Sequence, residues 1–437
     1  MRVRLRLVDS EPTIWRTLDI DPSTPLDIMH LVLQQLFDWQ NVHLHQWRTL
    51  DPYARVRDGV DLVWLPANLL DEMDGLPDTE VMIGDALALA DGTLHYEYDF
   101  GDSWHVTIER LDGESGNSEP HSGRNGTPAV DGARRGPLDD SGGIHAWNEV
   151  VAAPQRARMP VDPAQFDPAA ATASVRRLLD VTTELPALRP LLTRVNSEVG
   201  QKWVARAEAA VEHPPTATDA EIEASIAPVR WMLRRIGPNG TALTAAGWLP
   251  PALVRDAMRE LGWEYRDVGK MNREDLTPDI ADLRARMRWL GLLRVAKGRI
   301  APTAVARLLV DDPAGLWRYV AEHLVSRQTS DVSRDLVLVL ALHLVSGRAL
   351  DEQQLAARLA LDLTALGWRD RGDGGPRDFL EGTVSTDSAR YMLYEVLPAL
   401  RDLGAFAEGR KRWEWSGELT STGRALGWQM LGRMLPT

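Results

Sequence analysis

The sequence contains no cysteine and only four lysines among its 437 residues. Without cysteine the chain cannot form disulfides, thiolate zinc sites, iron–sulfur clusters or cysteine nucleophiles. No uninterrupted apolar run approaches the roughly 20 residues that cross a bilayer, and the start, MRVRLRLVDSEP, lacks the apolar core of a signal peptide. We therefore expect a cytoplasmic protein without membrane contact, and its length predicts about two to four domains.

Several catalytic motifs are also missing. The sequence has no Gly-x-x-x-x-Gly-Lys-Ser/Thr loop for nucleotides, no Gly-x-Ser-x-Gly elbow and no His-Glu-x-x-His helix. A serine recombinase needs an arginine-rich N-terminal catalytic domain, and the first 160 residues contain only 13 arginines, with no matching order of elements. We predict no cofactor and no resolvase catalysis, and we favour a protein that is not an enzyme.

Acidic residues are concentrated in the first third of the chain. Residues 1–160 contain 13 arginines and no lysine against 27 acidic residues, which accounts for the whole net charge of −14. The remaining residues are neutral in sum. Such an asymmetry is typical of a domain boundary.

The first 111 residues show the patterns of a mixed α and β fold. Apolar residues alternate with arginines over residues 2–7, and a second extended run covers 14–20, which predicts two paired strands. At Thr24-Pro25-Leu26-Asp27, an N-cap, a proline at the first helical position and an acid at the third predict a helix that ends near Trp39. Further strands are expected at 43–50, 60–64, 92–99 and 104–111.

The middle of the chain changes in composition. Residues 112–143 hold eight glycines and three prolines without periodicity, which predicts a long loop. From about Pro163 the sequence becomes rich in Ala, Leu and Arg with helical spacing, and Pro214-Pro215 interrupts it. We predict four parts: an acidic α+β domain with a mixed sheet and flanking helices (1–160), a helical connector (161–215) and two mainly helical, winged-helix-like domains (216–325 and 326–437).

An internal repeat supports the last two parts. The segment MRWLGLL at 287–293 resembles LRDLGAF at 400–406, and each precedes a Thr-x-x-small-Arg-x-Leu element, at 303–309 and 420–426. A fainter third copy covers 233–247. Each copy predicts a helix that ends at a glycine, a short hairpin and a new helix capped by threonine, which is the layout of a winged helix.

A basic segment lies within this repeat. Residues 283–310 contain seven basic residues and no acid. In winged helices that bind nucleic acid, the helix before the hairpin enters the major groove and the hairpin contacts the backbone. The candidate nucleic-acid-binding residues are Arg284, Arg286, Arg288, Arg294, Lys297 and Arg299 in the first copy, and Arg410, Lys411 and Arg412 in the second. Arginine is the default cation of this chain, however, so a solvated or ion-paired face and a protein-interaction module remain alternatives.

Four short elements follow one another in the acidic part. They are Ile14-Trp15-Arg16, Trp39 with His43-Leu44-His45, Tyr98-Asp99-Phe100-Gly101-Asp102-Ser103-Trp104, and Gly136-Pro137-Leu138-Asp139-Asp140-Ser141-Gly142-Gly143. Together they resemble the plasmid pRiA4b ORF-3-like family, also called insertion-sequence passenger TnpR-like proteins, over residues 1–155. The resemblance implies an α+β fold and an association with plasmids and mobile elements, but no activity. Val106 stands where the family often has histidine, and the family's C-terminal cysteines are absent.

The same elements pose a chemical question. We expect His43 and His45 to project from one face of a strand and Asp99, Asp102 and His105 to come from a nearby hairpin, a donor set that suits a divalent metal. A site for another ligand or partner, and a purely structural role, remain alternatives, because aspartates beside Gly101 also bond their own turn. The candidate site residues are Arg16, His43, His45, Tyr98, Asp99, Asp102, Trp104, His105, Asp139 and Asp140, and the candidate metal ligands are His43, His45, Asp102 and His105.

These observations favour a non-enzymatic, mobile-element-associated accessory or regulatory protein. Its winged-helix-like C-terminal half would contact double-stranded DNA or a protein partner. Two further interpretations remain open: a metal-dependent hydrolase that uses His43, His45, Asp99, Asp102 and His105, and a protein-interaction scaffold.

Overall fold

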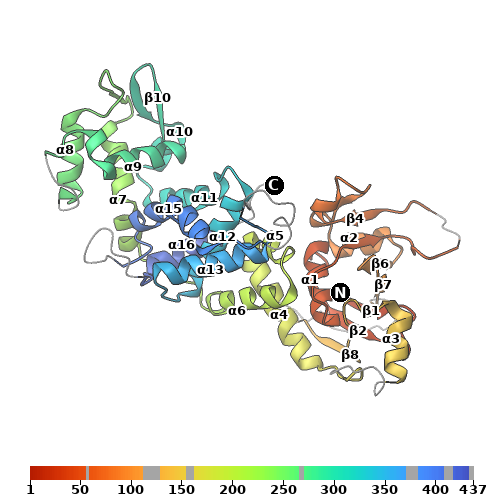
Figure 1. Cartoon of the computed structure of the whole chain (residues 1–437). Helices are drawn as coiled ribbons and strands as arrows, with labels where there is room; N and C mark the ends of the chain where they lie inside the picture. Colours follow the sequence, from red (N-terminus) through yellow and green to blue (C-terminus); the bar gives the residue numbers. More distant parts are fainter. Residues whose placement is uncertain are drawn as a thin grey trace. The chain divides into compact units, whose positions relative to one another are not determined.

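The computed structural model divides the chain into two compact units (Figure 1). It describes residues 1–55, 59–111, 128–153, 162–264, 270–370, 382–407 and 417–432. Unit 1 consists of Met1–Thr183 with Arg189–Ala205, and unit 2 consists of Glu184–Leu188 with Arg206–Thr437. Residues 161–215, the expected connector, contribute to both units. The division of residues 216–437 into two domains stays a prediction.

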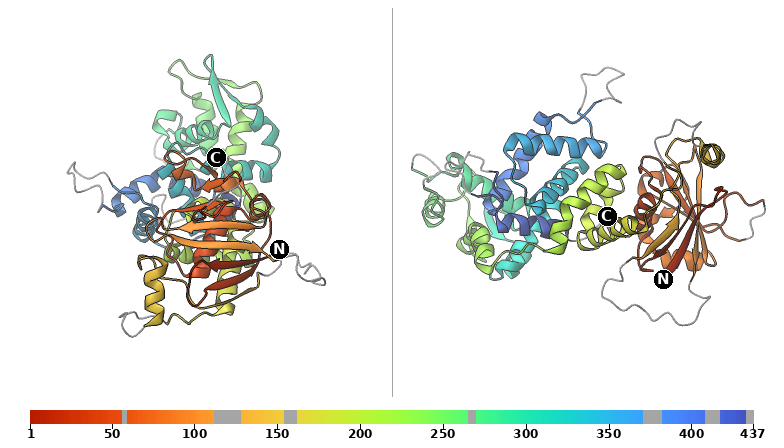
Figure 2. Two further views of the ribbon diagram at one scale, coloured as in Figure 1. Left: turned by 90° about the vertical axis from the view of Figure 1, so that its right-hand side faces the viewer. Right: turned by 90° about the horizontal axis from the view of Figure 1, so that it is seen from below.

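An eight-stranded mixed sheet forms the centre of unit 1, in the order β5-β4-β3-β6-β7-β1-β2-β8. The left view of Figure 2 shows strands of this sheet side by side. Neighbouring strands are antiparallel except β4 and β5. The strands are β1 (Arg2–Leu7), β2 (Trp15–Asp19), β3 (His45–Arg48), β4 (Val63–Leu65), β5 (Leu76–Pro77), β6 (Thr93–Tyr98), β7 (Trp104–Arg110) and β8 (Val130–Ala133). The α+β fold class expected for this part is confirmed.

Helices accompany this sheet and continue beyond it. Up to residue 212 they are α1 (Leu26–Phe37), α2 (Ile83–Leu89), α3 (Gly143–Ala152), α4 (Pro168–Glu184), α5 (Arg189–Leu192) and α6 (Ser197–Glu212), with short 3-10 turns η1 (Ala67–Leu69), η2 (Asp78–Glu80) and η3 (Pro186–Leu188). The helical spacing that begins at about Pro163 corresponds here to α4 and α6.

The two faces of the sheet differ in polarity because side chains alternate along each strand. In β1, Val3, Leu5 and Leu7 are buried, whereas the arginines between them are exposed. Helix α1 packs on the buried face, where the His30 ring nitrogen Nδ1 lies 2.8 Å from the Tyr96 hydroxyl of β6. The opposite face carries polar side chains from β1, β3, β6 and β7.

The start of α1 differs by one residue from the prediction. The helix begins at Leu26, and Pro25 occupies the N-cap position without a side-chain cap, so Thr24 is not the cap. Asp27 instead accepts two hydrogen bonds from Arg189 Nη2, at 2.8 and 3.1 Å. The helix ends at Phe37, where Asp38 adopts a left-handed conformation with φ of 59°.

Part of the predicted loop at 112–143 is a strand. Residues 112–127 lie outside the described part, but Val130–Ala133 form β8 and pair with β2. Past this strand, a Cβ on Gly136 would lie 1.9 Å from the backbone oxygen of Phe37. Only glycine allows the chain to pass this close to the end of α1.

Unit 2 is mainly helical, as expected. Its helices are α7 (Asp219–Ile236), α8 (Pro251–Glu260), α9 (Pro278–Trp289), α10 (Ala304–Leu309), α11 (Pro313–Ser326), α12 (Asp331–Ser346), α13 (Glu352–Ala365), α15 (Thr386–Asp402) and α16 (Ser421–Leu431), with the 3-10 turn η5 (Glu274–Leu276). Residues 335–345 of α12 are all buried. A Cβ on Gly427 of α16 would lie 2.7 Å from the Ala341 oxygen, so these two helices pack closely.

A small three-stranded sheet accompanies the first helices of unit 2. Its order is β10-β11-β9, with β9 (Thr241–Ala242), β10 (Leu293–Ala296) and β11 (Arg299–Pro302) all antiparallel to their neighbours. The chain therefore runs α7, β9, α8, α9, β10, β11 and α10. This order places a two-stranded hairpin directly after α9.

The two stronger copies of the repeat form the same local structure. Gly291 and Gly404 end a helix with φ of 73° and 70°. The hydroxyl groups of Thr303 and Thr420 then donate to the oxygens of Gly291 and Gly404, at 2.8 and 2.5 Å, and each threonine caps the next helix. The third copy departs from this pattern, because Thr244 accepts from Trp248 N within a turn and the next helix begins only at Pro251.

In the part of the chain that the structure describes, no helix has both the length and the apolar character needed to span a membrane.

Candidate functional site

Three segments of unit 1 meet beside the turn between β6 and β7. His43 precedes β3, Asp99 follows β6 and Asp140 precedes α3. The His43 Nε2 atom lies 3.5 Å from Asp99 Oδ2 and 3.4 Å from Asp140 Oδ1. The Asp140 side chain is 80% exposed and that of Asp99 only 9%, so the group opens to solvent on one side.

The β6–β7 turn is organised by Asp99. Its φ of 60° is left-handed, and its Oδ1 atom accepts hydrogen bonds from the backbone of Gly101 at 3.0 Å and Asp102 at 3.3 Å. Aspartate favours such turns because its short side chain bonds the following amides. Asp99 therefore holds the turn with one oxygen while the other faces His43.

Tyr98 and Asp139 lie behind this turn. The Tyr98 hydroxyl accepts from Val42 N at 3.2 Å and hydrogen-bonds to Asp139, whose Oδ2 accepts from Gln40 N at 2.7 Å. Burial raises the pKa of Asp139, and the hydrogen bonds with Gln40 and Tyr98 oppose this shift. Both side chains fix the segment that carries His43.

Asp102 connects the turn to the start of α3. Its Oδ2 accepts the backbone N–H of Gly142 at 3.0 Å. Gly143 has a φ of 80°, and a Cβ there would lie 3.0 Å from the backbone oxygen of Asp102. The Gly142-Gly143 pair is thus needed for the close approach of this loop.

The geometry brings His43, Tyr98, Asp99, Asp102, Asp139 and Asp140 together, from elements far apart in sequence. An imidazole beside two carboxylates can bind a cation or a basic group, or exchange a proton with one of the acids. These residues belong to sequence elements that all lie in the first third of the chain.

Residues 1–170 match the family model of the plasmid pRiA4b ORF-3-like protein. The match confirms the resemblance that we inferred for residues 1–155. The crystal structure of the protein of unknown function MM3350 from Methanosarcina mazei Go1 is similar at 22% identity, with a TM-score of 0.30, over 38% of this chain and 93% of that one. The comparison with curated proteins gives no match.

His45 does not join His43 in the pRiA4b ORF-3-like segment. Its ring stacks on His30 of α1, with centroids 3.6 Å apart, and its Nε2 lies 3.1 Å from Asp78 Oδ2. Burial lowers the pKa of His45 to about 3 and raises that of Asp78 to about 6. The expected metal set that included His45 and Asp102 is therefore not assembled, because His45 is buried under α1 and Asp102 bonds Gly142.

This buried group contains residues that the sequence analysis missed. His30 Nε2 lies 2.7 Å from Asn41 Oδ1, and Gln34 donates to the Tyr96 hydroxyl at 3.2 Å. The signal in the sequence was the pair His30 and Gln34, two polar residues four positions apart within the largely apolar predicted helix. These side chains satisfy one another in the interior, which indicates a structural role.

His105 lies on the opposite face of the sheet. It pairs in register with Glu97 of β6, whereas its neighbour Trp104 pairs with Tyr98. Its Nε2 lies 3.0 Å from His95 Nδ1. His105 is therefore separated from the His43 group by the alternation of side chains along β7.

Arg16 and Trp104 are part of the core. Both side chains are fully buried. Arg16 donates to the oxygens of Leu36 at 2.9 Å and Ala133 at 3.0 Å, and its guanidinium lies over the Phe166 ring at 3.8 Å. Burial lowers the pKa of Arg16 to about 9. These contacts join β2, α1 and β8 and leave Arg16 inaccessible to a ligand.

The candidate nucleic-acid-binding residues of unit 2 separate into two groups. Arg284 is buried and pairs with Glu274 at 2.8 Å, and Arg286 pairs with Asp402. The remaining four residues of the first copy are exposed: Arg288, Arg294, Lys297 and Arg299. Arg410, Lys411 and Arg412 lie outside the described residues.

Proposed function

We propose that unit 2 contacts the phosphate backbone of double-stranded DNA through the β10–β11 hairpin. The order α7, β9, α8, α9, β10, β11, with β9 completing the small sheet, supports the winged-helix layout that the repeat predicts. In this arrangement the hairpin is the wing, and wings contact the nucleic-acid backbone. The protein then acts as a non-enzymatic accessory or regulatory factor of a mobile element, in keeping with its pRiA4b ORF-3-like segment.

The charge on the hairpin carries this proposal. Arg294, Lys297 and Arg299 are all exposed on it. Lys297 and Gly298 form its tip with φ of 49° and 69°, the conformation of a tight two-residue hairpin turn. No acidic residue occurs between residues 283 and 310. Arg294 and Lys297 can therefore approach phosphates without competition from acids of the same segment. Arg299, which also donates to the Gly240 oxygen at 2.7 Å, adds a third positive charge beside them.

Helix α9 is less suited to reading bases. Its exposed positions include Asp282 and Ala285, with Arg288 as the exposed cation, because Arg284 and Arg286 are engaged by acids. Base recognition needs side chains that reach base edges, whereas phosphate contacts give affinity without sequence information. We therefore expect binding to duplex DNA with little sequence preference.

Fluorescence anisotropy with a labelled duplex at several salt concentrations tests the proposal. The logarithm of the association constant falls linearly with the logarithm of the salt concentration, and removal of about three phosphate contacts should make this slope shallower by about 2 to 3. The variant R294A/K297A/R299A should show this loss. The variant R318A/R348A/R358A removes the same charge from another part of unit 2 and should retain the wild-type slope.

Two results would reject this function. One is an absence of binding by the wild-type protein at low salt, which would leave a protein-interaction scaffold. The other is an equal loss in both triple variants, which would show that overall charge and not the hairpin governs binding.

A further inference from the structure

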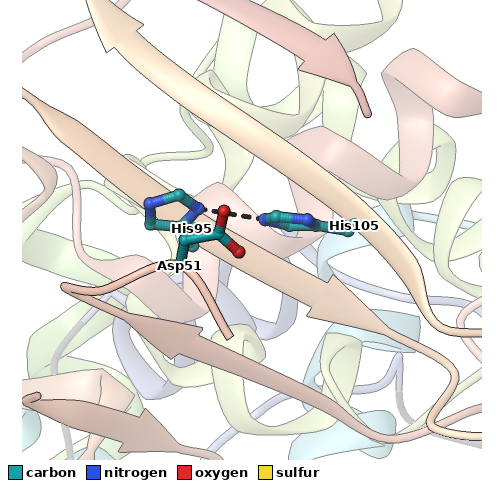
Figure 3. A group of neighbouring side chains, drawn as sticks. All are labelled: Asp51, His95 and His105. Atoms are coloured by element: carbon teal, nitrogen blue, oxygen red, sulfur yellow. Dashed lines mark hydrogen bonds between the residues drawn. The ribbon is translucent and has the colours of Figure 1, made fainter. Parts of the chain in front are cut away.

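A second group of potential metal ligands lies on the polar face of the unit 1 sheet, away from His43. It consists of Asp51, His95 and His105, whose ligand atoms all lie within 4.8 Å of one another (Figure 3). His95 comes from β6 and His105 from β7, so both are held by paired central strands. Asp51 comes from the segment after β3, and its carboxylate lies beside both rings in Figure 3.

The distance between the two imidazoles suits a shared metal ion. His95 Nδ1 and His105 Nε2 are 3.0 Å apart. Two nitrogens bound to one ion at about 2.1 Å are roughly 3 to 3.4 Å from each other in octahedral or tetrahedral geometry. The strands therefore already place both donor atoms at nearly the separation that coordination requires.

An imidazole binds a metal ion through a ring nitrogen that carries no proton. His95 Nδ1 and His105 Nε2 face each other, so these are the nitrogens that a shared ion would take. Metal binding would replace the hydrogen bond between them, and the proton would reside on the ring nitrogen that does not face the ion.

Surrounding side chains orient this group. Asp51 Oδ1 accepts the Tyr53 N–H at 2.8 Å, and the Tyr53 ring lies 5.4 Å from that of His105. The Tyr53 hydroxyl donates to Glu97 Oε1 at 2.6 Å, and Gln46 donates to Glu97 Oε2 at 2.6 Å. Among these bonds, the one from the Tyr53 N–H acts directly on a proposed ligand, Asp51, and such outer hydrogen bonds fix the orientation of metal ligands in known sites.

We propose that Asp51, His95 and His105 bind a divalent transition-metal ion such as Zn²⁺. Two neutral imidazoles and one carboxylate form a donor set that these ions prefer, and three protein ligands leave at least one position for water. The His43 group offers one imidazole and two carboxylates, one of them largely exposed. It is therefore the weaker competitor for the same ion.

Calorimetric titration of chelator-treated full-length protein with Zn²⁺ tests this site. We expect one equivalent to bind the wild-type protein and the H43A variant, and binding to be lost in H95A/H105A. Co²⁺ should give visible absorption bands in the wild type and in H43A but not in H95A/H105A. D51N should weaken Zn²⁺ binding about tenfold or more and provides a milder variant if the double substitution does not fold.

Three outcomes would overturn the site. The first is that the wild-type protein binds no Zn²⁺ at a concentration of about 100 μM. The second is that H43A loses binding, and the third is that H95A/H105A binds Zn²⁺ as the wild type does. If H43A loses Zn²⁺ binding and H95A/H105A retains it, the ion is bound by the His43 group. None of these outcomes bears on DNA binding by unit 2.

Discussion

Arg284 and Glu274 form a buried ion pair in unit 2. Arg284 Nη1 lies 2.9 and 2.8 Å from the two carboxylate oxygens, and the side chains are only 9% and 2% exposed. Glu274 Oε2 also accepts the N–H of Leu249 at 2.6 Å, and Arg284 Nη2 donates to the Gly247 oxygen at 3.1 Å. The pair thus connects α9 to η5 and to the turn before α8.

Substitution of Arg284 by methionine should destabilise the protein strongly. The carboxylate of Glu274 would remain buried without its partner, which typically costs about 3 to 5 kcal/mol. R288M removes an exposed arginine from the same helix and should change the free energy of unfolding by less than about 0.5 kcal/mol. Urea unfolding followed by tryptophan fluorescence measures both. A loss in R284M as small as that in R288M would contradict the structural role.

Six of the described strands of unit 1 and helix α1 were predictable because their patterns are local, whereas the two-residue strand β5 was not predicted. Alternation over residues 2–7 and helical spacing after Leu26 follow from one face being buried. Strand β8 was not predictable, because Val130–Ala133 are an edge strand within a Gly-rich segment. Their pairing with β2 depends on residues more than 100 positions earlier.

The contacts of the site residues were also hard to predict where their partners lie far away in the sequence. The turn chemistry around Asp99 was visible in the sequence, but Arg284 and Arg286 meet Glu274 and Asp402, acids outside the basic segment. A local charge count therefore overestimates the free charge on α9. His105 was grouped with Asp102 by proximity in sequence, whereas the register of β6 with β7 turns it to the other face beside His95.

The stability of the protein should fall at acidic pH partly because of His343. This side chain of α12 is buried, and burial lowers its pKa to about 4, with smaller effects from Arg206, Arg358 and Arg348. In the unfolded chain its pKa is about 6.5. Between these two values the unfolded state binds a proton that the folded state does not, so stability decreases as pH falls from 6.5 towards 4.

The variant H343Q should remove this contribution. Between pH 7.5 and pH 5, the free energy of unfolding of H343Q should fall by about 2 kcal/mol less than that of the wild type. Denaturant unfolding at about pH 5, 6 and 7.5 measures the free energy of unfolding of each variant. H213Q alters an exposed histidine and should follow the wild-type curve. Parallel curves for wild type and H343Q would show that His343 is protonated equally in both states.

The two threonine caps of the repeat should contribute equally to stability. Thr303 and Thr420 each bond a glycine oxygen of the preceding helix end and cap the following helix. T303A and T420A should each lower the free energy of unfolding by about 1 kcal/mol, because an N-cap hydroxyl satisfies an otherwise unpaired helical N–H. T303S and T420S retain the hydroxyl and should lower the free energy of unfolding by only a few tenths of that amount. If the serine variants lose as much as the alanine variants, the methyl group and not the hydrogen bond stabilises these junctions.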